Sequence, residues 1–374
     1  MKKKIIQRGG LAAAGLLLII LFFLLFRGTE KTELMETEGR SFEKAEVTAV
    51  LQDNETENGN IAGNQIVRLL LLTGEYKGEQ VEAASSSGYL FGAHCEEGMK
   101  VVAIVNESNG ELVASVYSVN REPMIWLMAA LFVAIVVLVG GRKGLSSILG
   151  LVFTMLCILF IFLPMIYRGI SPVLAAVLVT AVTTVVTMCL IDGISKKSAA
   201  AMAGTVIGVI IAGIFAWVFS KVTRISGYNV TDIENLIYVG EMTDIRIGEL
   251  LFAGILIAAL GAVMDVGISI ASTLNELKET DGTLTAKELF RSGMNVGRDM
   301  MGTMSNTLIL AFTGGSINTL VFIYAYNYQY RQIINMYSIG IELMQGLSAS
   351  MGVILTVPVT SLIGAWLLGA KRRN

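Results

Sequence analysis

The sequence predicts a mainly α-helical protein: a polytopic transmembrane bundle of about eight spans with a small β-rich domain between the first and second spans. Three observations carry this prediction. Hydrophobic residues make up 54% of the 374 residues and charged residues only 16%, which is far more apolar than a soluble protein. Apolar segments long enough to cross about 30 Å of hydrocarbon recur along the chain. A polar, acidic segment separates the first of them from the rest.

The chain divides into three predicted parts: residues 1–28, an N-terminal membrane anchor; residues 29–122, an extracytoplasmic domain; and residues 123–374, a domain of seven membrane helices. The first apolar run, 11–26, reads as a signal anchor or as the core of a signal peptide. We favour the anchor because residues 27–30 lack a small-x-small cleavage pattern. The later spans are predicted at 124–141, 148–167, 172–191, 199–219, 249–272, 302–324 and 347–368.

Residues 29–122 have the composition of a water-soluble domain. Runs of β-forming residues recur at 45–51, 65–72, 80–84, 100–105 and 112–119, separated by Asn, Gly and Glu clusters. Residues 73–78, Thr-Gly-Glu-Tyr-Lys-Gly, are typical of a hairpin connection. About five short strands predict a small barrel or sandwich, with an OB-like barrel as one form. Acidic side chains outnumber basic ones by more than two to one, which argues against binding of nucleic acid.

Positive charge in the short loops predicts the orientation of the bundle. If the N-terminus is cytoplasmic, every predicted inside segment carries Lys or Arg, whereas the outer segments are biased toward acidic and Tyr residues. The inside set is Lys2, Lys3, Lys4, Arg8, Arg142, Lys143, Lys196, Lys197, Lys278, Lys287, Arg291, Arg298, Lys371, Arg372 and Arg373. The sequence therefore predicts a multi-pass protein of the bacterial cytoplasmic membrane, with both termini cytoplasmic and residues 29–122 extracytoplasmic.

Small residues predict close helix packing in two spans. Gly204-x-x-x-Gly208 in one span, and the small residues Ala258, Gly261 and Ala262 in another, would let helices approach closely, and glycine in membrane helices more often packs than contacts a ligand. Pro358 lies inside the last span between Thr356 and Thr360. Because proline removes a backbone donor and its ring clashes with the preceding turn, we expect a kink there that helps to shape a cavity.

The segment 297–318 is the least apolar stretch of membrane length in the chain. Lipid offers hydrogen-bond partners to none of its polar groups, so the segment is expected to face other helices, a bound ligand or a watery cavity. Gly314 and Gly315 are a candidate interruption of the helix, as in transporters with broken helices. The candidate pathway residues of this segment are Arg298, Asp299, Thr303, Ser305, Asn306, Thr307, Gly314, Gly315 and Asn318.

Asp265 is the outstanding charge inside a predicted span. A carboxyl group at such a depth is expected to face the bundle interior, pair with a cation or carry a proton; the alternative is hydration near the cytoplasmic boundary. Ser269 extends a polar stripe from Asp265 toward the cytoplasm, although its hydroxyl group can instead bond its own helix. On antiparallel helices Asp265 and Asn306 lie at similar depth. If they meet, their oxygen atoms suit a cation or a proton rather than a soft metal.

Two segments resemble the YibE/F-like family of bacterial multipass membrane proteins. They are Gly-Ala-Val-Met-Asp-Val-Gly-Ile-Ser-Ile-Ala at 261–271 and Gly-Arg-Asp-Met-Met-Gly-Thr-Met-Ser-Asn-Thr-Leu-Ile-Leu-Ala-Phe-Thr-Gly at 297–314. The resemblance covers roughly 124–369, and the acidic domain before it fits the same arrangement. It implies a suggested role in transport and no catalytic set.

Two classes of function follow. The first, which we favour, is a permease or channel for a small solute or ion with a polar intramembrane site around Asp265 and Asn306. The second is a non-transporting assembly or signalling protein whose ectodomain binds an envelope partner, and a homo-oligomer fits either class. No enzymatic activity, catalytic residue, metal or cofactor is expected, because GxGD, HExxH and P-loop patterns are absent from the sequence.

Overall fold

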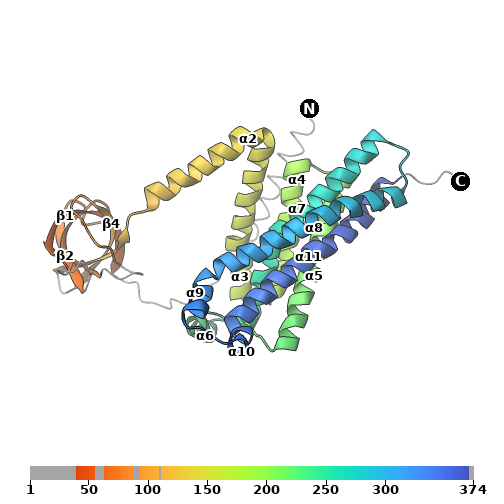
Figure 1. Cartoon of the computed structure of the whole chain (residues 1–374). Helices are drawn as coiled ribbons and strands as arrows, with labels where there is room; N and C mark the ends of the chain where they lie inside the picture. The colour runs from red at the N-terminus through yellow and green to blue at the C-terminus, as the bar shows by residue number, and fades with distance from the viewer. Residues whose placement is uncertain (1–38, 55–62, 87–91, 109–110, 370–374) are drawn as a thin grey trace. The chain divides into compact units, whose positions relative to one another are not determined.

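The computed structural model describes residues 39–54, 63–86, 92–108 and 111–369. They fall into two compact units, one ending at Ile135 and the other beginning at Val136. The first unit holds a β-barrel and the start of a long helix, and the second unit is helical (Figure 1). The predicted anchor, 11–26, and the basic residues 371–373 lie outside the described residues.

Each of the five predicted runs in residues 29–122 forms a strand. The strands are β1 (Arg40–Gln52), β2 (Asn64–Leu71), β3 (Gln80–Ser86), β4 (Lys100–Ser108) and β5 (Glu111–Val119). They close into a barrel in the order β1-β2-β3-β5-β4, in which β3 and β5 pair in parallel and the other pairs are antiparallel. Of the two predicted forms, the structure shows the barrel.

Alternation of side chains along the strands produces the barrel core. In β2, Val67, Leu69 and Leu71 are buried and alternate with half-buried neighbours, as the two faces of a strand require. The predicted hairpin joins β2 to β3, where the Gly78 amide donates to the Leu71 carbonyl at 2.8 Å. Gly74 and Gly78 have φ of 85° and 93°, a region that glycine enters without steric cost.

A buried glutamine ties two parts of the barrel together. Gln65 is 1% exposed; its Nε2 donates to Asp53 Oδ1 at 3.0 Å and to the Cys95 carbonyl at 3.2 Å, and its Oε1 accepts from the Cys95 amide at 2.7 Å. We expect Gln65→Leu to destabilise the barrel by about 2–3 kcal/mol, because it leaves buried backbone groups unpaired. Hydrogen exchange of the full chain should be faster around Cys95. The exposed Gln80→Leu serves as the control, and equal exchange in both variants would contradict this role.

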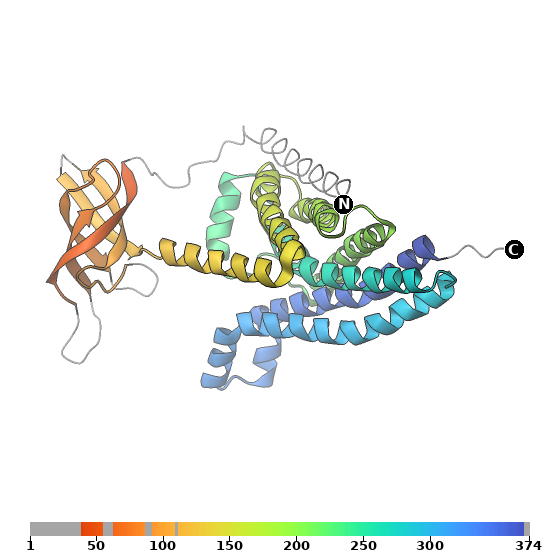
Figure 2. The same ribbon diagram turned by 90° about the horizontal axis from the view of Figure 1, so that it is seen from above.

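Helices follow the barrel. They are α2 (Glu122–Cys157), the π-helical turn η1 (Ile158–Phe162), α3 (Leu163–Tyr167), α4 (Pro172–Asp192), α5 (Lys196–Thr223), α6 (Ile233–Met242), α7 (Ile247–Thr280), α8 (Ala286–Gly315), α9 (Ile317–Ala325), α10 (Tyr330–Ile334) and α11 (Tyr337–Leu368). Helix α7 packs against α4, α5, α8 and α11, and α11 packs against α5 and α8. Figures 1 and 2 both show α8 lying alongside α11.

The predicted total of eight spans is not confirmed. In the described chain five helical runs are long and apolar enough to cross a membrane, or six if the bent pair α8–α9 is one span. Within Glu122–Tyr167, where the sequence predicts two spans, the structure has a run of 46 residues in which two helices meet at a kink. At about 1.5 Å per residue this run is longer than twice the hydrocarbon thickness. Its helix is interrupted at Gly141 (φ 54°, ψ −132°), the last residue of the first predicted span.

The connection between α7 and α8 is shorter than the sequence predicts. The apolar spans 249–272 and 302–324 suggest a long polar connection, but α7 continues to Thr280 and α8 begins at Ala286. A capping box starts α8: the Thr285 hydroxyl accepts from the Glu288 amide, and the Glu288 carboxylate accepts from the Thr285 amide at 2.8 Å. Hydropathy marks where a helix becomes polar, not where its backbone stops being helical.

Glycines bring α5, α8 and α11 close together. A Cβ atom on Gly204 would lie 1.9 Å from Thr360 Oγ1, and one on Gly208 would lie 1.8 Å from Thr356 Oγ1. The predicted packing role of Gly204 and Gly208 is therefore confirmed. Helix α11 is helical throughout, so Pro358 does not break it. Thr356 and Thr360 are fully buried against glycines of α5. A cavity at Pro358 stays a prediction.

Candidate functional site

The polar residues of α8 lie on the face of the helix that the bundle does not cover. Leu289, Gly293 and Gly297 are buried on the inner face. The predicted residues Arg298, Asp299, Thr303, Asn306 and Thr307 are all exposed on the other side, and Ser305 is half-buried. In a membrane, such a face needs water, a ligand or another polypeptide beside it, because lipid cannot satisfy its polar groups.

Some polar groups of α8 are satisfied within the helix. The hydroxyl groups of Thr303 and Thr307 donate to the carbonyls four residues earlier, at 3.4 and 3.0 Å. Ser305 Oγ is buried without a hydrogen-bond partner among the described residues. The Asn306 side chain also forms no hydrogen bond with any part of the chain that the structure describes. Between Thr303 and Thr307, the side-chain polar atoms without a described partner therefore belong to Ser305 and Asn306. The hydroxyl groups of the two threonines form hydrogen bonds within their own helix.

The predicted interruption of this segment is present. Helix α8 ends at Gly315, α9 begins at Ile317, and the axes of the two helices differ by 62°. A side chain at Gly314 or Gly315 would meet nothing within 4 Å, so the glycines permit the bend rather than relieve a crowded contact. Asn318 is exposed in the first turn of α9. The chain therefore carries a sharply bent helix pair in its most polar membrane segment.

A cavity of about 330 Å³ lies beside the bend. It is enclosed by α8 and α9 on one side and by α10 and α11 on the other. Its polar side chains are Thr313 and Ser316 at the bend and Glu342, which is half-buried on α11. The Thr313 hydroxyl donates to the Ile309 carbonyl at 2.7 Å, so Ser316 and Glu342 are the polar groups most available to a ligand. Polarity along the chain did not indicate that Glu342 lines this cavity.

Asp265 is exposed on a stripe of small residues along α7. Gly254, Ala258 and Gly261 precede it at helical spacing on the same side, and all are exposed. A Cβ atom on Gly254 or Gly261 would meet nothing within 4 Å, so the close helix packing predicted for Ala258 and Gly261 is wrong for the part of the chain that the structure describes. Ser269 follows Asp265 one turn later and is half-buried. This stripe is open over its length and ends in a carboxyl group.

The structure does not join the predicted residues into one bonded cluster. Among the described residues, Asp265 makes no hydrogen bond or ion pair, with Asn306 or with any other group. Arg298 and Asp299, adjacent in sequence, form no ion pair with each other or with another described residue. Asp265 and Asn306 have exposed side chains on neighbouring helices, α7 and α8. Their convergence on one ligand stays a prediction.

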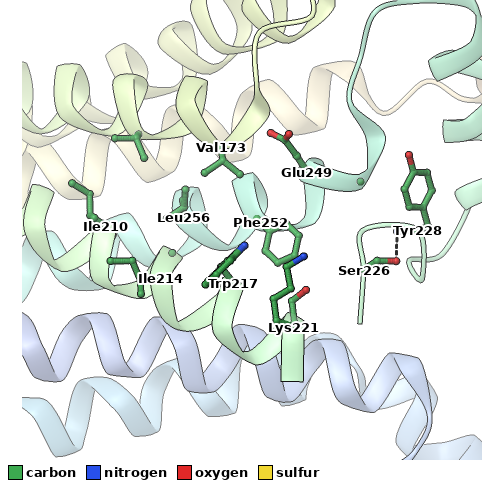
Figure 3. A pocket seen from close by; sticks show the side chains of 14 residues that line it. Val173, Ile210, Ile214, Trp217, Lys221, Ser226, Tyr228, Glu249, Phe252 and Leu256 are labelled. Atoms are coloured by element: carbon green, nitrogen blue, oxygen red, sulfur yellow. Dashed lines mark hydrogen bonds between the residues drawn. The ribbon is translucent and has the colours of Figure 1, made fainter. Parts of the chain in front are cut away.

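A second and larger cavity, of about 570 Å³, lies between α4, α5 and α7 (Figure 3). Most of its wall is apolar, formed by Val173, Val177, Ile210, Gly213, Ile214, Trp217, Phe252 and Leu256. In Figure 3, Ile210, Ile214 and Leu256 lie at one end and Ser226 and Tyr228 at the other. Nothing in the sequence indicated this cavity, because its apolar wall is indistinguishable, by composition, from an ordinary membrane helix.

Two charged side chains line this cavity, and their environments differ. Glu249 forms a hydrogen bond with the Ser171 hydroxyl and an ion pair with Arg246 at 3.7 Å. Lys221, in the last turn of α5, is exposed and has no hydrogen bond or ion pair with the described residues. The positive charge of Lys221 is therefore the uncompensated one in the cavity.

Buried hydroxyl groups between the helices are a further feature that composition did not indicate. Thr205 and Thr360 are fully buried, and their Oγ1 atoms have no hydrogen-bond partner among the described residues. Thr360 Oγ1 faces Gly204, and a Cβ atom on Gly267 would lie 2.8 Å from Thr205 Oγ1. Hydroxyl oxygen against a glycine Cα is a recurring contact at close helix crossings. The signal that could have revealed these threonines is their position opposite glycines of a neighbouring helix. That signal can be read only once it is known which helices pair.

The long apolar helices pack closely through small residues, enclose cavities between them and include one bent polar pair. These features are those of an integral membrane protein built on a helical bundle. Residues 128–370 match the family model described as YibE/F-like protein. Because the match spans more than half of the chain, the protein belongs to the YibE/F-like family, and the resemblance found at 261–271 and 297–314 is confirmed. No match was found among curated proteins or among solved structures.

Proposed function

We propose that this protein is a permease or channel for a small solute or ion in the bacterial cytoplasmic membrane. The observation that carries the proposal is the bend between α8 and α9 beside a cavity of about 330 Å³. Helix breaks in transporters free backbone groups and turn helix ends toward a substrate or ion. Ser316 and Glu342 add side-chain oxygen atoms at this bend. The proposal assigns the chain no catalytic step.

The outward polar face of α8 supports a path that leads to the bend. Asn306 lies on that face about ten residues, or ~15 Å of helix, from Ser316. Asp265 is an exposed carboxyl group on the adjacent helix. A second copy of the chain would shield both faces from lipid and supply the other wall of the path. In the proposed orientation both termini are cytoplasmic and the barrel is extracytoplasmic.

Flux through the purified full-length protein in sealed liposomes tests this proposal. Imposed proton and potassium gradients, followed with a pH-sensitive dye and a potassium-sensitive dye, should relax faster than in empty liposomes. Ile309→Trp, which fills the cavity at the bend, should slow the flux several-fold. Val321→Trp is the matched control, since Val321 is an exposed residue of α9 that does not line the cavity and is not on the outward face of α8. Equal flux in the two variants would place the path elsewhere, and flux equal to that of empty liposomes would contradict transport of these ions.

A second candidate, a partner-binding assembly protein, is favoured by the outer surface of the barrel. Phe42 is 59% exposed and Val113 is 55% exposed on this otherwise acidic domain. The Phe42 ring packs edge-on against Tyr117 at 5.2 Å between centroids, which holds it in place. Exposed apolar side chains of this kind often mark contacts with other proteins. If this second function is correct, a photo-crosslinker at position 42 should capture one envelope protein, and one at the hairpin residue Lys77 should not. The purified protein should then show no ion flux in liposomes.

A further inference from the structure

The larger cavity has the shape and chemistry of a site for an amphiphile. From Ile210 to Lys221 its wall follows α5 for eleven residues, or about 16 Å of helix. Its volume of about 570 Å³ falls in the range of sites that enclose small molecules. The apolar and polar parts of the wall are separated along this length (Figure 3). A ligand that fits must therefore have an extended apolar part and a polar head.

The cavity is open on the side where lipid would lie. Ile214 is 54% exposed and Ile210 is 39% exposed, although both line the cavity. Trp217 and Tyr228 are also more than half exposed, at the polar end. Tryptophan and tyrosine collect at the level of the lipid headgroups, which identifies this end of the cavity with the membrane interface. A chain from the bilayer can therefore enter sideways while its head remains at the interface.

Charge identifies the head. Glu249 is already engaged by Ser171 and Arg246, whereas Lys221 has no partner among the described residues. An ammonium group without a described partner at the polar end complements an anion. Tyr228 lines the same cavity and adds a hydroxyl group, whereas the Ser226 hydroxyl already donates to Asn229 Oδ1 at 3.0 Å.

From this geometry we propose that the cavity between α4, α5 and α7 binds an anionic phospholipid of the surrounding bilayer. One acyl chain lies against Ile210, Ile214 and Leu256, and the phosphate group lies at Lys221. The site is separate from the bend between α8 and α9, so it holds whether or not the protein transports ions.

Native mass spectrometry of the delipidated full-length protein tests the proposal. We expect phosphatidylglycerol to be retained more strongly than phosphatidylcholine, and Lys221→Gln to weaken phosphatidylglycerol binding about tenfold by removing a charge-assisted contact. Lys196→Gln is the matched control, because Lys196 is an exposed lysine without a described partner at the other end of α5. Ile214→Trp, which fills the apolar end, should reduce the binding of both lipids.

The possible outcomes separate the alternatives. Equal retention of the two lipids, or equal effects of Lys221→Gln and Lys196→Gln, would overturn the proposal. So would displacement of the lipid by inorganic phosphate alone, which would identify a soluble anion as the ligand. Melting temperatures in detergent check that each variant is folded. If Lys221→Gln is unfolded, Lys221→Arg, which keeps the charge, should retain the preference for phosphatidylglycerol, and its loss would contradict the site.

Discussion

Replacement of Gly204 and Gly208 by alanine together is expected to be strongly destabilising. A methyl group at Gly204 would lie 1.9 Å from Thr360 Oγ1 and 3.2 Å from the Thr360 Cα, so a side-chain rotation alone does not make room. At Gly208 it would meet Thr356 Oγ1 at 1.8 Å and Val263 Cγ1 at 2.8 Å, on two different helices. Helices α5 and α11 would have to separate, and overpacking of this kind costs about 1–3 kcal/mol at each site.

Thermal unfolding in detergent, followed by tryptophan fluorescence, measures this effect. The double variant should melt well below the unmodified protein. Gly254→Ala is the matched control: it is also a helical glycine, but its Cβ atom would meet nothing within 4 Å, so it should be neutral or stabilising by up to about 1 kcal/mol. Combining Gly208→Ala with Thr356→Ala should restore part of the lost stability. An unchanged melting temperature in the double glycine variant would show that the helices do not cross this closely.

Asp265→Asn is expected to abolish ion-coupled flux without destabilising the protein. Asparagine has nearly the same shape as aspartate but can neither carry a negative charge nor exchange a proton. Asp265 makes no hydrogen bond or ion pair with the described residues, so the substitution breaks no contact there. A charge within a membrane helix is itself costly, so its removal should leave the melting temperature equal or higher.

The proton-flux assay in liposomes measures the effect of Asp265→Asn. Glu276→Gln provides the control, since Glu276 is another exposed acidic residue of α7, eleven positions closer to the end of the helix. Flux should be lost in the first variant and retained in the second. Retention of full flux by Asp265→Asn would rule out a coupling role for this carboxyl group, and a fall in melting temperature would indicate a structural one.

Local sequence patterns were sufficient to predict those elements whose residues follow one simple pattern along their whole length. The five strands follow from alternation and turn residues, since one face of each strand faces the barrel core. The break after Gly315 follows from paired glycines in a polar segment. The length of the helices was not predictable in the same way. Helices α7 and α8 continue through polar residues to a capped turn, and hydropathy does not report on capping.

The candidate site was only partly predictable for a related reason. Polarity in an apolar chain indicates which residues need an explanation, and it selected Asp265, Asn306 and the bend. It does not indicate which helix lies opposite, so it neither located Glu342 beside the bend nor revealed the cavity that Lys221 and Trp217 line.

The sequence by itself determined the class of this protein, its family, the five strands and the polar segment with its break, because composition, residue period and glycine pairs act over a few neighbouring residues. Only the tertiary structure decided which faces are covered. It turned the polar face of α8 outward, set Thr356 and Thr360 against glycines of α5, and left an open cavity between α4, α5 and α7. The physical reason is that burial and cavities depend on pairs of helices far apart in the sequence, whose contacts no local pattern records.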